Sequence, residues 1–431
     1  MTQKTTVPPP PSMPIARWAE GTLVRRLQFA RMVTVLGCRE SGKTKLLTRF
    51  FHDASDYRNL DDPDTLIAAM DNPNAFVRHQ GTSALVIDEV AKALPLIGSM
   101  KFVVDQNPTS GQYLLAGSAD YRRVPHAIES LAGRNSVVRL RTLSEAEKRG
   151  QHPNVLRALM AGQWPRTSPS PCSLDTVLPL VLAGGFPALS EVQDPRQRMR
   201  WLRTYRQRVI PAELKAFWNV RKVDRVDALL VAAAQHSGTI PRLDRIASDL
   251  SLAWATLSTY WDALEALFLI DSVPGWGTLG ANRARFTPKV YMTDSALMAH
   301  LLGITSIDSI RLGSTRTTAV GEQLLKTWVY NQLMPEIDAQ TGWSLYHVAT
   351  RQHTIDFVIT NDEGARLGIS VVGKEGLDAH DVKHVQWLKR TLGDRVPFRG
   401  LVFYLGNYVR TFREDCFGLP VSVLWSDPNT W

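Results

Sequence analysis

The chain has 431 residues, of which 44% are hydrophobic and 21% are charged, and its formal net charge is +9. This composition excludes a disordered chain, and the length predicts two to four domains with cores of their own. The positive charge permits an acidic partner such as nucleic acid but does not identify one.

The cysteines and the N-terminal residues indicate the cellular setting. Cys38, Cys172 and Cys416 are scattered and odd in number, which argues against a disulfide framework and fits a reducing cytoplasm. No apolar run reaches the roughly 18 residues that a membrane-spanning helix needs. Four prolines occupy residues 8–11, there is no signal-peptide core, and residues 1–15 are expected to form a flexible tail. We therefore expect a cytoplasmic protein without membrane contact.

The first motif follows a short apolar, β-rich run at residues 32–36. It reads G-x-x-x-x-G-K-T, the pattern of a phosphate-binding loop, and a helical run comes after it. Glycines let the backbone N–H groups face phosphate oxygens, and the start of the helix adds positive potential. The residues predicted to bind ATP are Gly37, Cys38, Arg39, Glu40, Ser41, Gly42, Lys43 and Thr44. Lys43 is expected to reach the β- and γ-phosphates, and Thr44 to bind Mg²⁺.

A second apolar run, residues 85–87, ends in Asp88-Glu89. Buried parallel strands read as continuous apolar runs, and ligands bind at their carboxyl ends. Asp88 is therefore expected to hold the Mg²⁺ shell, while Glu89 orients and deprotonates the attacking water. Together with the phosphate loop, this run predicts an Mg²⁺-dependent ATPase.

Two further residues are candidates for catalysis. Ser118 ends a third apolar strand, where it would either sense the γ-phosphate or serve as a plain turn serine. Arg134 follows Gly133, where it would either supply transition-state charge to the nucleotide of a neighbouring subunit or lie on the surface. The first role of Arg134 requires a homo-oligomer.

The succession G-C-R-E-S-G-K-T, N-L-D-D-P, V-I-D-E-V, L-L-A-G-S and S-L-A-G-R resembles a large, mostly uncharacterised prokaryotic family of AAA-type ATPases. Members of that family carry a C-terminal domain of unknown function, and the resemblance continues at residues 184–187 and 288–294. It implies that residues 16–150 form a P-loop α/β sandwich that binds adenine rather than guanine nucleotides. Lys45 departs from the family pattern, which usually has Thr or Ser there, but Thr44 is unaffected.

Residues 151–225 are expected to form a linker followed by an Arg-rich helical region. From residue 196 to residue 225, ten basic residues stand against only two acids, Glu213 and Asp224. The basic residues are Arg196, Arg198, Arg200, Arg203, Arg206, Arg208, Lys215, Arg221, Lys222 and Arg225. This region either contacts a DNA backbone or is a solvated face that meets acidic loops of the protein itself.

Residues 226–304 are predicted to form a winged helix-turn-helix, with helices at 227–236, 243–250 and 255–269. The third helix would ordinarily enter a DNA groove, but residues 251–282 contain no Lys or Arg. Its apolar residues suit packing against protein: Trp254, Leu257, Trp261, Leu264 and Leu267. Arg283 and Arg285 are the basic residues of the wing. Any DNA contact is therefore expected from the Arg-rich region.

Residues 312–431 have an α/β pattern, with helices at 321–333 and 378–392, and resemble a restriction-endonuclease-like fold. Active members of that fold hold a metal with a helix Glu, a strand Asp and a Glu-x-Lys. Asp356 matches the strand Asp, but Lys326 stands where the helix Glu is expected, with Glu322 one turn earlier. Residues 370–372 read Ser-Val-Val in place of Glu-x-Lys. A nuclease-like domain without cleavage activity is therefore predicted.

The sequence thus predicts an α/β protein with three parts: an N-terminal P-loop parallel-sheet sandwich, a helical and winged-helix middle, and a nuclease-like C-terminal domain. Its predicted function is an ATPase that acts on DNA as a switch or motor. The alternative is an ATP-controlled switch that recruits an unidentified protein, and an ATP-gated nuclease is the third choice.

Overall fold

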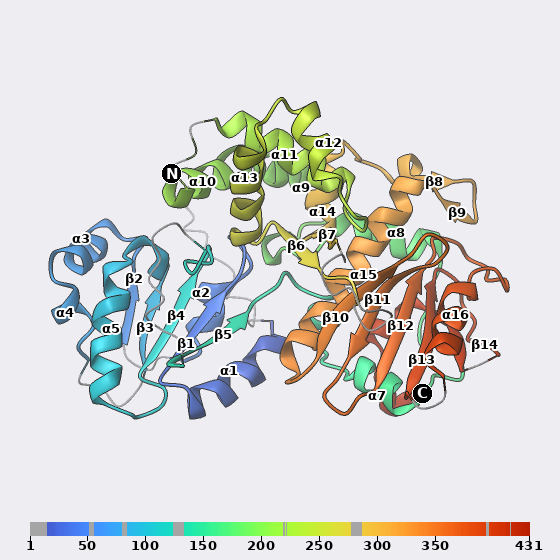
Figure 1. The fold of residues 1–431 in the computed structure, drawn as a ribbon, viewed down its shortest axis with the longest axis horizontal. Helices are drawn as coiled ribbons and strands as arrows, with labels where there is room; N and C mark the ends of the chain where they lie inside the picture. The colour runs from blue at the N-terminus through green and yellow to red at the C-terminus, as the bar shows by residue number, and fades with distance from the viewer. Residues whose placement is uncertain are drawn as a thin grey trace, which may run out of the picture.

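The computed structural model describes residues 15–50, 56–79, 84–123, 133–218, 220, 222–276, 287–393, 396–413 and 415–431. Figure 1 shows two β-sheets side by side and a group of helices that lies across one end of both. Residues 1–14 of the predicted tail, the S-L-A segment before Gly133, Arg221 and the wing residues Arg283 and Arg285 lie outside the described residues. Within the described ranges, no helix is long and apolar enough to cross a membrane.

The first sheet is five-stranded and entirely parallel, in the order β2-β3-β4-β1-β5. Its strands are β1 (Met32–Leu36), β2 (Tyr57–Asn59), β3 (Leu85–Asp88), β4 (Tyr113–Gly117) and β5 (Asn135–Arg139). The helices of this part are α1 (Trp18–Phe29), α2 (Lys43–Leu47), α3 (Pro63–Asp71), α4 (Pro73–Phe76) and α5 (Pro95–Gln106). Strands β1, β3 and β4 are buried along their whole length. Alternate side chains of β1 face opposite layers, because Val33 and Val35 pack in the cluster of α1 and α2, while Met32 and Leu36 pack in that of α5.

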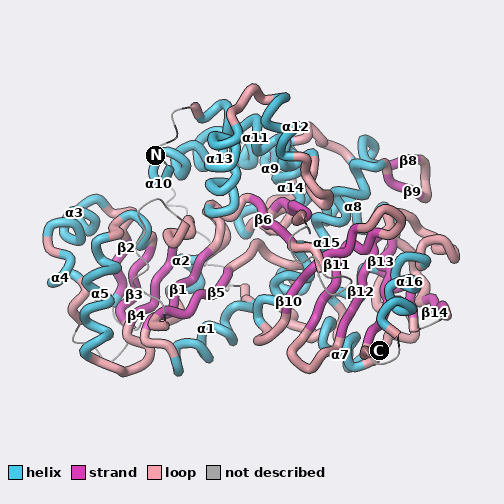
Figure 2. Tube along the Cα trace, in the orientation of Figure 1, coloured by secondary structure: helices cyan, strands magenta, loops and turns pink. Residues whose placement is uncertain are grey.

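The middle of the chain is mostly helical, as Figure 2 shows. It contains α6 (Glu145–Lys148), α7 (Val155–Ala161), α8 (Leu174–Ala183), α9 (Pro195–Thr204), a π-helical turn η5 (Tyr205–Val209), α10 (Ile210–Trp218), α11 (Val223–Gln235), α12 (Leu243–Asp249), α13 (Trp254–Ala266) and α14 (Ser295–Leu301). The hairpin of β6 (Ile270–Val273) and β7 (Lys289–Met292) follows α13. The three predicted helices and a strand pair are thus present in order, and their identity as a winged helix stays a prediction. The expected linker was wrong in part, because residues 155–161 form a helix with a buried face.

The second sheet is six-stranded and mixed, in the order β10-β11-β12-β13-β15-β14. Its strands are β10 (Ser344–Ala349), β11 (Thr354–Thr360), β12 (Arg366–Val371), β13 (Phe398–Tyr404), β14 (Arg410–Phe412) and β15 (Cys416–Pro420). A small hairpin, β8 (Arg311–Leu312) with β9 (Arg316–Thr317), precedes the long helix α15 (Ala319–Ala339). Helix α16 (Lys383–Leu392) starts later than the predicted residue 378, because Asp378 and Asp381 form a turn around Lys374.

Helix α15 joins the three parts. It continues through Pro335, beyond the predicted end at Leu333, and most of its residues are buried. At its C-terminal end the carbonyl of Ala339 accepts hydrogen bonds from Thr22 (3.1 Å) and Arg25 (3.0 Å) of α1. Burial of α15 between the two sheets stabilises the turn that contains proline, despite the hydrogen bond that proline cannot donate.

A half-buried ionic network also connects the parts. Arg141, which follows β5, lies 2.6 Å from Asp271 of β6 and 2.5 Å from Asp338 of α15. Tyr330 of α15 donates to Asp271 at 2.9 Å. Burial opposes ionisation of Asp271, but Arg141 and Arg139 prevail and lower its pKa to about 2. The first sheet, the middle region and α15 therefore share one set of half-buried charges.

Glu336 of α15 is expected to make folding stability depend on pH. Its carboxylate accepts the backbone N–H groups of Leu156 (3.0 Å) and Arg157 (3.3 Å), and burial raises its pKa to about 8. The folded state therefore retains a proton that the unfolded state releases near pH 4.3, so stability falls by about 1.4 kcal/mol per pH unit between these values. Glu336→Gln should remove this slope. Urea unfolding of the wild type and of Glu336→Gln from pH 5 to pH 8 measures the free energy of unfolding. The same pH dependence in both proteins would contradict the expectation.

Candidate nucleotide site

Three segments meet at the carboxyl edge of the first sheet. Strands β1 and β3 both pair with β4 in parallel, so the residues after these strands lie side by side. These residues are the phosphate loop at 37–44, the pair Asp88-Glu89 and Ser118. The carboxyl edge of a parallel sheet is where such folds bind ligands. The structure thus brings together all predicted site residues except Arg134.

The backbone of the phosphate loop requires its two glycines. A Cβ atom at Gly37 would lie 2.1 Å from the carbonyl oxygen of Leu140, and Gly42 has a φ of 94°. Side chains are excluded sterically at the first position and disfavoured conformationally at the second. Lys43 is buried, and its Nζ donates to the carbonyls of Gly37 and Cys38 at 3.1 Å each. The ammonium therefore lies inside the curve of the loop.

Hard oxygen donors stand beside the loop. Thr44 Oγ1 donates to Asp88 Oδ2 at 2.6 Å, and the Tyr57 hydroxyl donates to the same oxygen at 3.0 Å. Burial raises the pKa of Asp88, although the Thr44 hydrogen bond partly offsets it. Ser41 Oγ is buried in the loop without a hydrogen-bond partner among the described residues. A hydroxyl, a carboxylate and an unsatisfied buried hydroxyl next to a phosphate loop fit Mg²⁺ with a nucleotide.

Glu89 is held in a constrained geometry at the end of β3. Its backbone is left-handed, with φ 57° and ψ 42°, a conformation that non-glycine residues adopt mainly where the surrounding structure imposes it. One carboxylate oxygen accepts the N–H (3.1 Å) and the hydroxyl (2.9 Å) of Ser118. The other oxygen accepts from Arg39 Nη1 at 2.7 Å. The predicted base and the predicted sensor are therefore in direct contact.

Sequence reasoning missed two residues of the middle region that reach this site. Glu213 of α10 lies with its carboxylate 2.5 Å from Ser118 Oγ, and the Tyr205 hydroxyl donates to the carbonyl of Arg39 at 3.1 Å. Burial raises the pKa of Glu213, and the nearby Glu89 raises it further. In the sequence Glu213 was notable only as one of two acids among ten basic residues, which gave no sign of its position.

Arg134 lies at the opposite edge of the sheet. It precedes β5, and its carbonyl accepts the N–H of Met32 at the start of β1 (3.1 Å). Its side chain pairs with Asp105 on α5, with Nη2 3.1 Å from Oδ2. Strands β1 and β5 run parallel, so Arg134 is separated from the phosphate loop of its own chain by the length of a strand. Its role toward a neighbouring subunit stays a prediction.

The Arg-rich region presents exposed cations along α9, η5 and α10. Arg206 is paired with Asp227 by two contacts of 2.7 Å, and Arg198 donates to the carbonyl of Val192. Other arginines are exposed and form no ion pair within the described ranges. They are Arg196, Arg200, Arg203 and Arg208. Among the described residues, the positive charge of these four arginines is therefore not neutralised by acidic loops of the protein itself.

The predicted remnant of a nuclease site contains lysines in place of metal ligands. Asp356 is buried, and its Oδ1 lies 3.2 Å from both Lys326 Nζ and Lys289 Nζ. Its Oδ2 accepts the N–H of Val371 at 3.0 Å. Burial opposes ionisation, but Lys326 and Lys289 lower the pKa of Asp356. The sequence identified Lys326 as a departure from the nuclease pattern. It did not predict that Lys289 of β7 also contacts Asp356.

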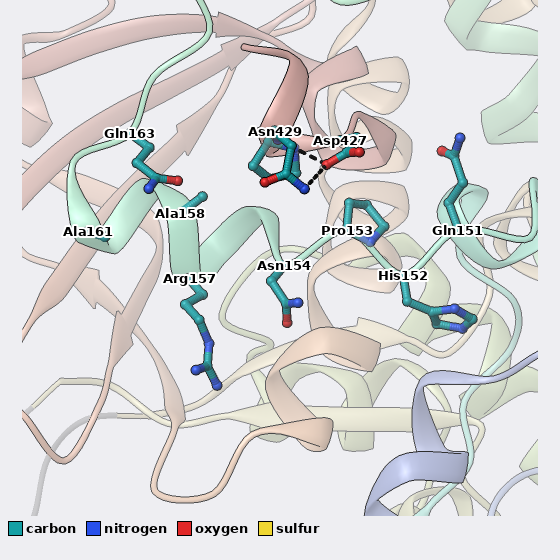
Figure 3. A pocket seen from close by; sticks show the side chains of 11 residues that line it. Gln151, His152, Pro153, Asn154, Arg157, Ala158, Ala161, Gln163, Asp427 and Asn429 are labelled. Carbon is teal, nitrogen blue, oxygen red and sulfur yellow. Dashed lines mark hydrogen bonds between the residues drawn. The ribbon is translucent and has the colours of Figure 1, made fainter.

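The cavity in Figure 3 is separate from the nucleotide site. It has a volume of about 560 Å³ and is lined by residues around α7 and at 427–429. Asp427 there accepts from the backbone N–H and the side-chain amide of Asn429, each at 2.9 Å. None of the predicted site residues lines this cavity.

Comparisons with known proteins agree with the geometry of the first sheet. Residues 30–148 match the family model of an AAA domain, and residues 175–308 match that of a domain of unknown function. Uncharacterized proteins of Mycobacterium tuberculosis and Mycobacterium bovis are each 26% identical over 289 residues, which is 67% of this chain but 60% of theirs. A Walker-type ATPase of Pyrococcus abyssi is similar over 66% of this chain and 94% of its own, with 14% identity and a TM-score of 0.40. By the match to the family model, residues 30–148 form a P-loop domain of the AAA type.

Proposed function

With an AAA-type ATPase domain at residues 30–148 as the premise, we propose that the chain is an Mg²⁺-dependent ATPase whose nucleotide state controls a DNA contact. Hydrolysis takes place at the carboxyl edge of the first sheet, and the Arg-rich region binds the DNA backbone. The protein is a switch or motor rather than a nuclease.

The proposed reaction is attack of water on the γ-phosphorus with loss of ADP. The bond to the β–γ bridging oxygen breaks, and the proton of the water passes to Glu89. Ser118 holds the Glu89 carboxylate in place through its N–H and hydroxyl, and Lys43 binds phosphate oxygens. Thr44 and Asp88 would hold Mg²⁺, which supplies neutralising charge on the phosphates when bound.

One observation supports the proposal that the nucleotide state controls DNA binding. The helical segment from α9 to α10 presents exposed arginines to solvent and also contacts the nucleotide site through Tyr205 and Glu213. The contact from Glu213 is made to Ser118, the predicted γ-phosphate sensor. A change at the γ-phosphate therefore has a short physical path to the cationic surface, which is what a two-state coupling requires.

Phosphate release with Mg-ATP, in the presence and absence of duplex DNA, tests the proposal. Turnover that needs Mg²⁺ and rises with DNA supports it. A rate of ATP turnover that does not change with DNA favours the alternative, which is a switch that recruits a protein. Trp254, which is 59% exposed at the start of α13, favours that alternative because large exposed aromatic residues are common at protein interfaces.

Charge reversal of the cationic surface should weaken DNA binding. In Arg200→Glu/Arg203→Glu, loss of two phosphate contacts is expected to lower duplex affinity at least about tenfold and to reduce the slope of log K against log salt by roughly 2. Fluorescence anisotropy across a salt series measures both quantities. Arg316→Glu/Arg351→Glu, which reverses two exposed arginines outside the Arg-rich region, is the matched control. Equal loss in both proteins would mean that only net charge matters.

A further inference from the structure

The side chain of Arg39 lies among acids from three separate elements. Its Nη1 is 2.7 Å from Glu89 after β3, and its Nη2 is 2.7 Å from Asp61 after β2. Glu213 of α10 is 4.0 Å away. Burial opposes the charge on Arg39, but Glu89, Asp61 and Glu213 prevail and raise its pKa. The guanidinium is therefore permanently charged, and only a change of partners alters its interactions.

The two close carboxylates do not depend on Arg39 alone. Asp61 also has Lys92 at 2.5 Å, and Glu89 also accepts two hydrogen bonds from Ser118. Removing one partner from a buried charge is costly when nothing else satisfies it. Asp61 keeps Lys92 and Glu89 keeps Ser118 as donors. Arg39 is therefore able to leave either carboxylate without leaving it unpaired.

The position of Arg39 also brings it near the reacting phosphate. In the proposed reaction, Glu89 holds the attacking water next to the γ-phosphorus. The Arg39 guanidinium contacts the same carboxylate, so it lies close to the place of that water. A guanidinium presents a planar fork of N–H donors that fits phosphate oxygens and neutralises transition-state charge. Arg39 has such a fork, and Arg134 lies at the other edge of the sheet.

We propose that Arg39 acts in cis on the γ-phosphate: it exchanges a carboxylate partner for the phosphate oxygens and thereby frees Glu89 to hold the attacking water. The inference rests on the proposed ATPase function. It goes beyond the phosphate loop motif, in which this position contributes only its backbone N–H. It also makes Arg39 a residue that distinguishes ATP from ADP, because ADP has no γ-phosphate to take the place of the carboxylate.

Binding of Mg-ADP and of a non-hydrolysable Mg-ATP analogue to the full chain, with steady-state turnover, tests the assignment. Arg39→Ala should lower kcat about 100-fold or more and reduce analogue affinity about tenfold while ADP affinity stays within twofold. Arg39→Lys should recover part of the affinity ratio through its charge, but little of kcat because it lacks the fork. Arg49→Ala is the matched control, since Arg49 has a similar exposed fraction (28% against 29%), follows the same loop and pairs with Glu20.

The outcomes separate this inference from the proposed function. A wild-type chain that binds neither nucleotide overturns both. A wild-type ATPase whose Arg39→Ala variant keeps kcat, or loses affinity for both nucleotides equally, overturns only the role of Arg39, which would then be a structural tie between loops. If Arg39→Ala does not fold, Arg39→Lys provides the test. A ratio of ATP-analogue affinity to ADP affinity equal to that of the wild type, together with full kcat, would also reject the role of Arg39.

Discussion

Glu89→Gln is expected to lower the rate of ATP hydrolysis by about 100-fold or more while nucleotide binding is retained. Glutamine keeps an acceptor for the two Ser118 hydrogen bonds, so the loop geometry should survive. An amide does not accept a proton from water, however, and general-base catalysis contributes roughly 10²–10⁴-fold. The variant should therefore bind Mg-ATP and release phosphate very slowly.

Phosphate release and equilibrium binding of Mg-ATP, measured on the same preparation, separate the two effects. Glu191→Gln removes an exposed carboxylate from the loop before α9 and controls for net charge. Full turnover in Glu89→Gln would assign the base to another group, of which Glu213 is the neighbour to examine next. Loss of binding in the variant would instead mean that the Glu89–Arg39 pair builds the loop.

The nucleotide site was predictable because it depends on local patterns. Gly37, Gly42, Lys43 and the Asp88-Glu89 pair each follow a buried strand, and parallel strands bring such segments to one edge whatever the rest of the fold does. Buried apolar runs also identified the strands themselves. These features need no knowledge of how distant segments pack.

The partners of that site were not predictable in the same way. Glu213 reaches Ser118 only because α10 packs over the carboxyl edge, and no periodicity in the sequence encodes that placement. Arg39 was assigned to the loop by motif, but its pairing with Asp61 depends on the neighbouring position of β2 and β3. The position of Arg134 follows from the parallel pairing of β5 with β1, which a single sequence does not specify.

The second sheet repeats this contrast. Its strands and the mismatch of Lys326 with the nuclease pattern were evident from residue order. Lys289 belongs to the hairpin after α13 and is 67 residues away from Asp356 in the sequence. Its ammonium reaches Asp356 only because the middle region packs onto the second sheet. The contact of both lysines with Asp356 is therefore a property of the tertiary structure.

Asp356→Ala is expected to lower the free energy of unfolding by about 3–5 kcal/mol, because it leaves the buried ammonium group of Lys289 and the partly exposed one of Lys326 without their shared carboxylate. Lys289 already has a pKa lowered by burial, and loss of Asp356 should lower it further. A lysine whose pKa is depressed in the folded state gains stability as pH rises toward its unfolded value near 10.4. The deficit of the variant should therefore shrink between pH 7 and pH 10.

Urea unfolding at several pH values measures this effect, with the exposed Asp308→Ala as the control. A loss of unfolding free energy below about 1 kcal/mol, or one that does not change with pH, would mean that the lysines pair with other groups.

The same preparations test whether the protein cleaves DNA. Neither wild type nor variant should nick DNA with Mg²⁺, because the carboxylate is committed to Lys289 and Lys326. Metal-dependent nicking that disappears in Asp356→Ala would show instead that these lysines give way to a metal.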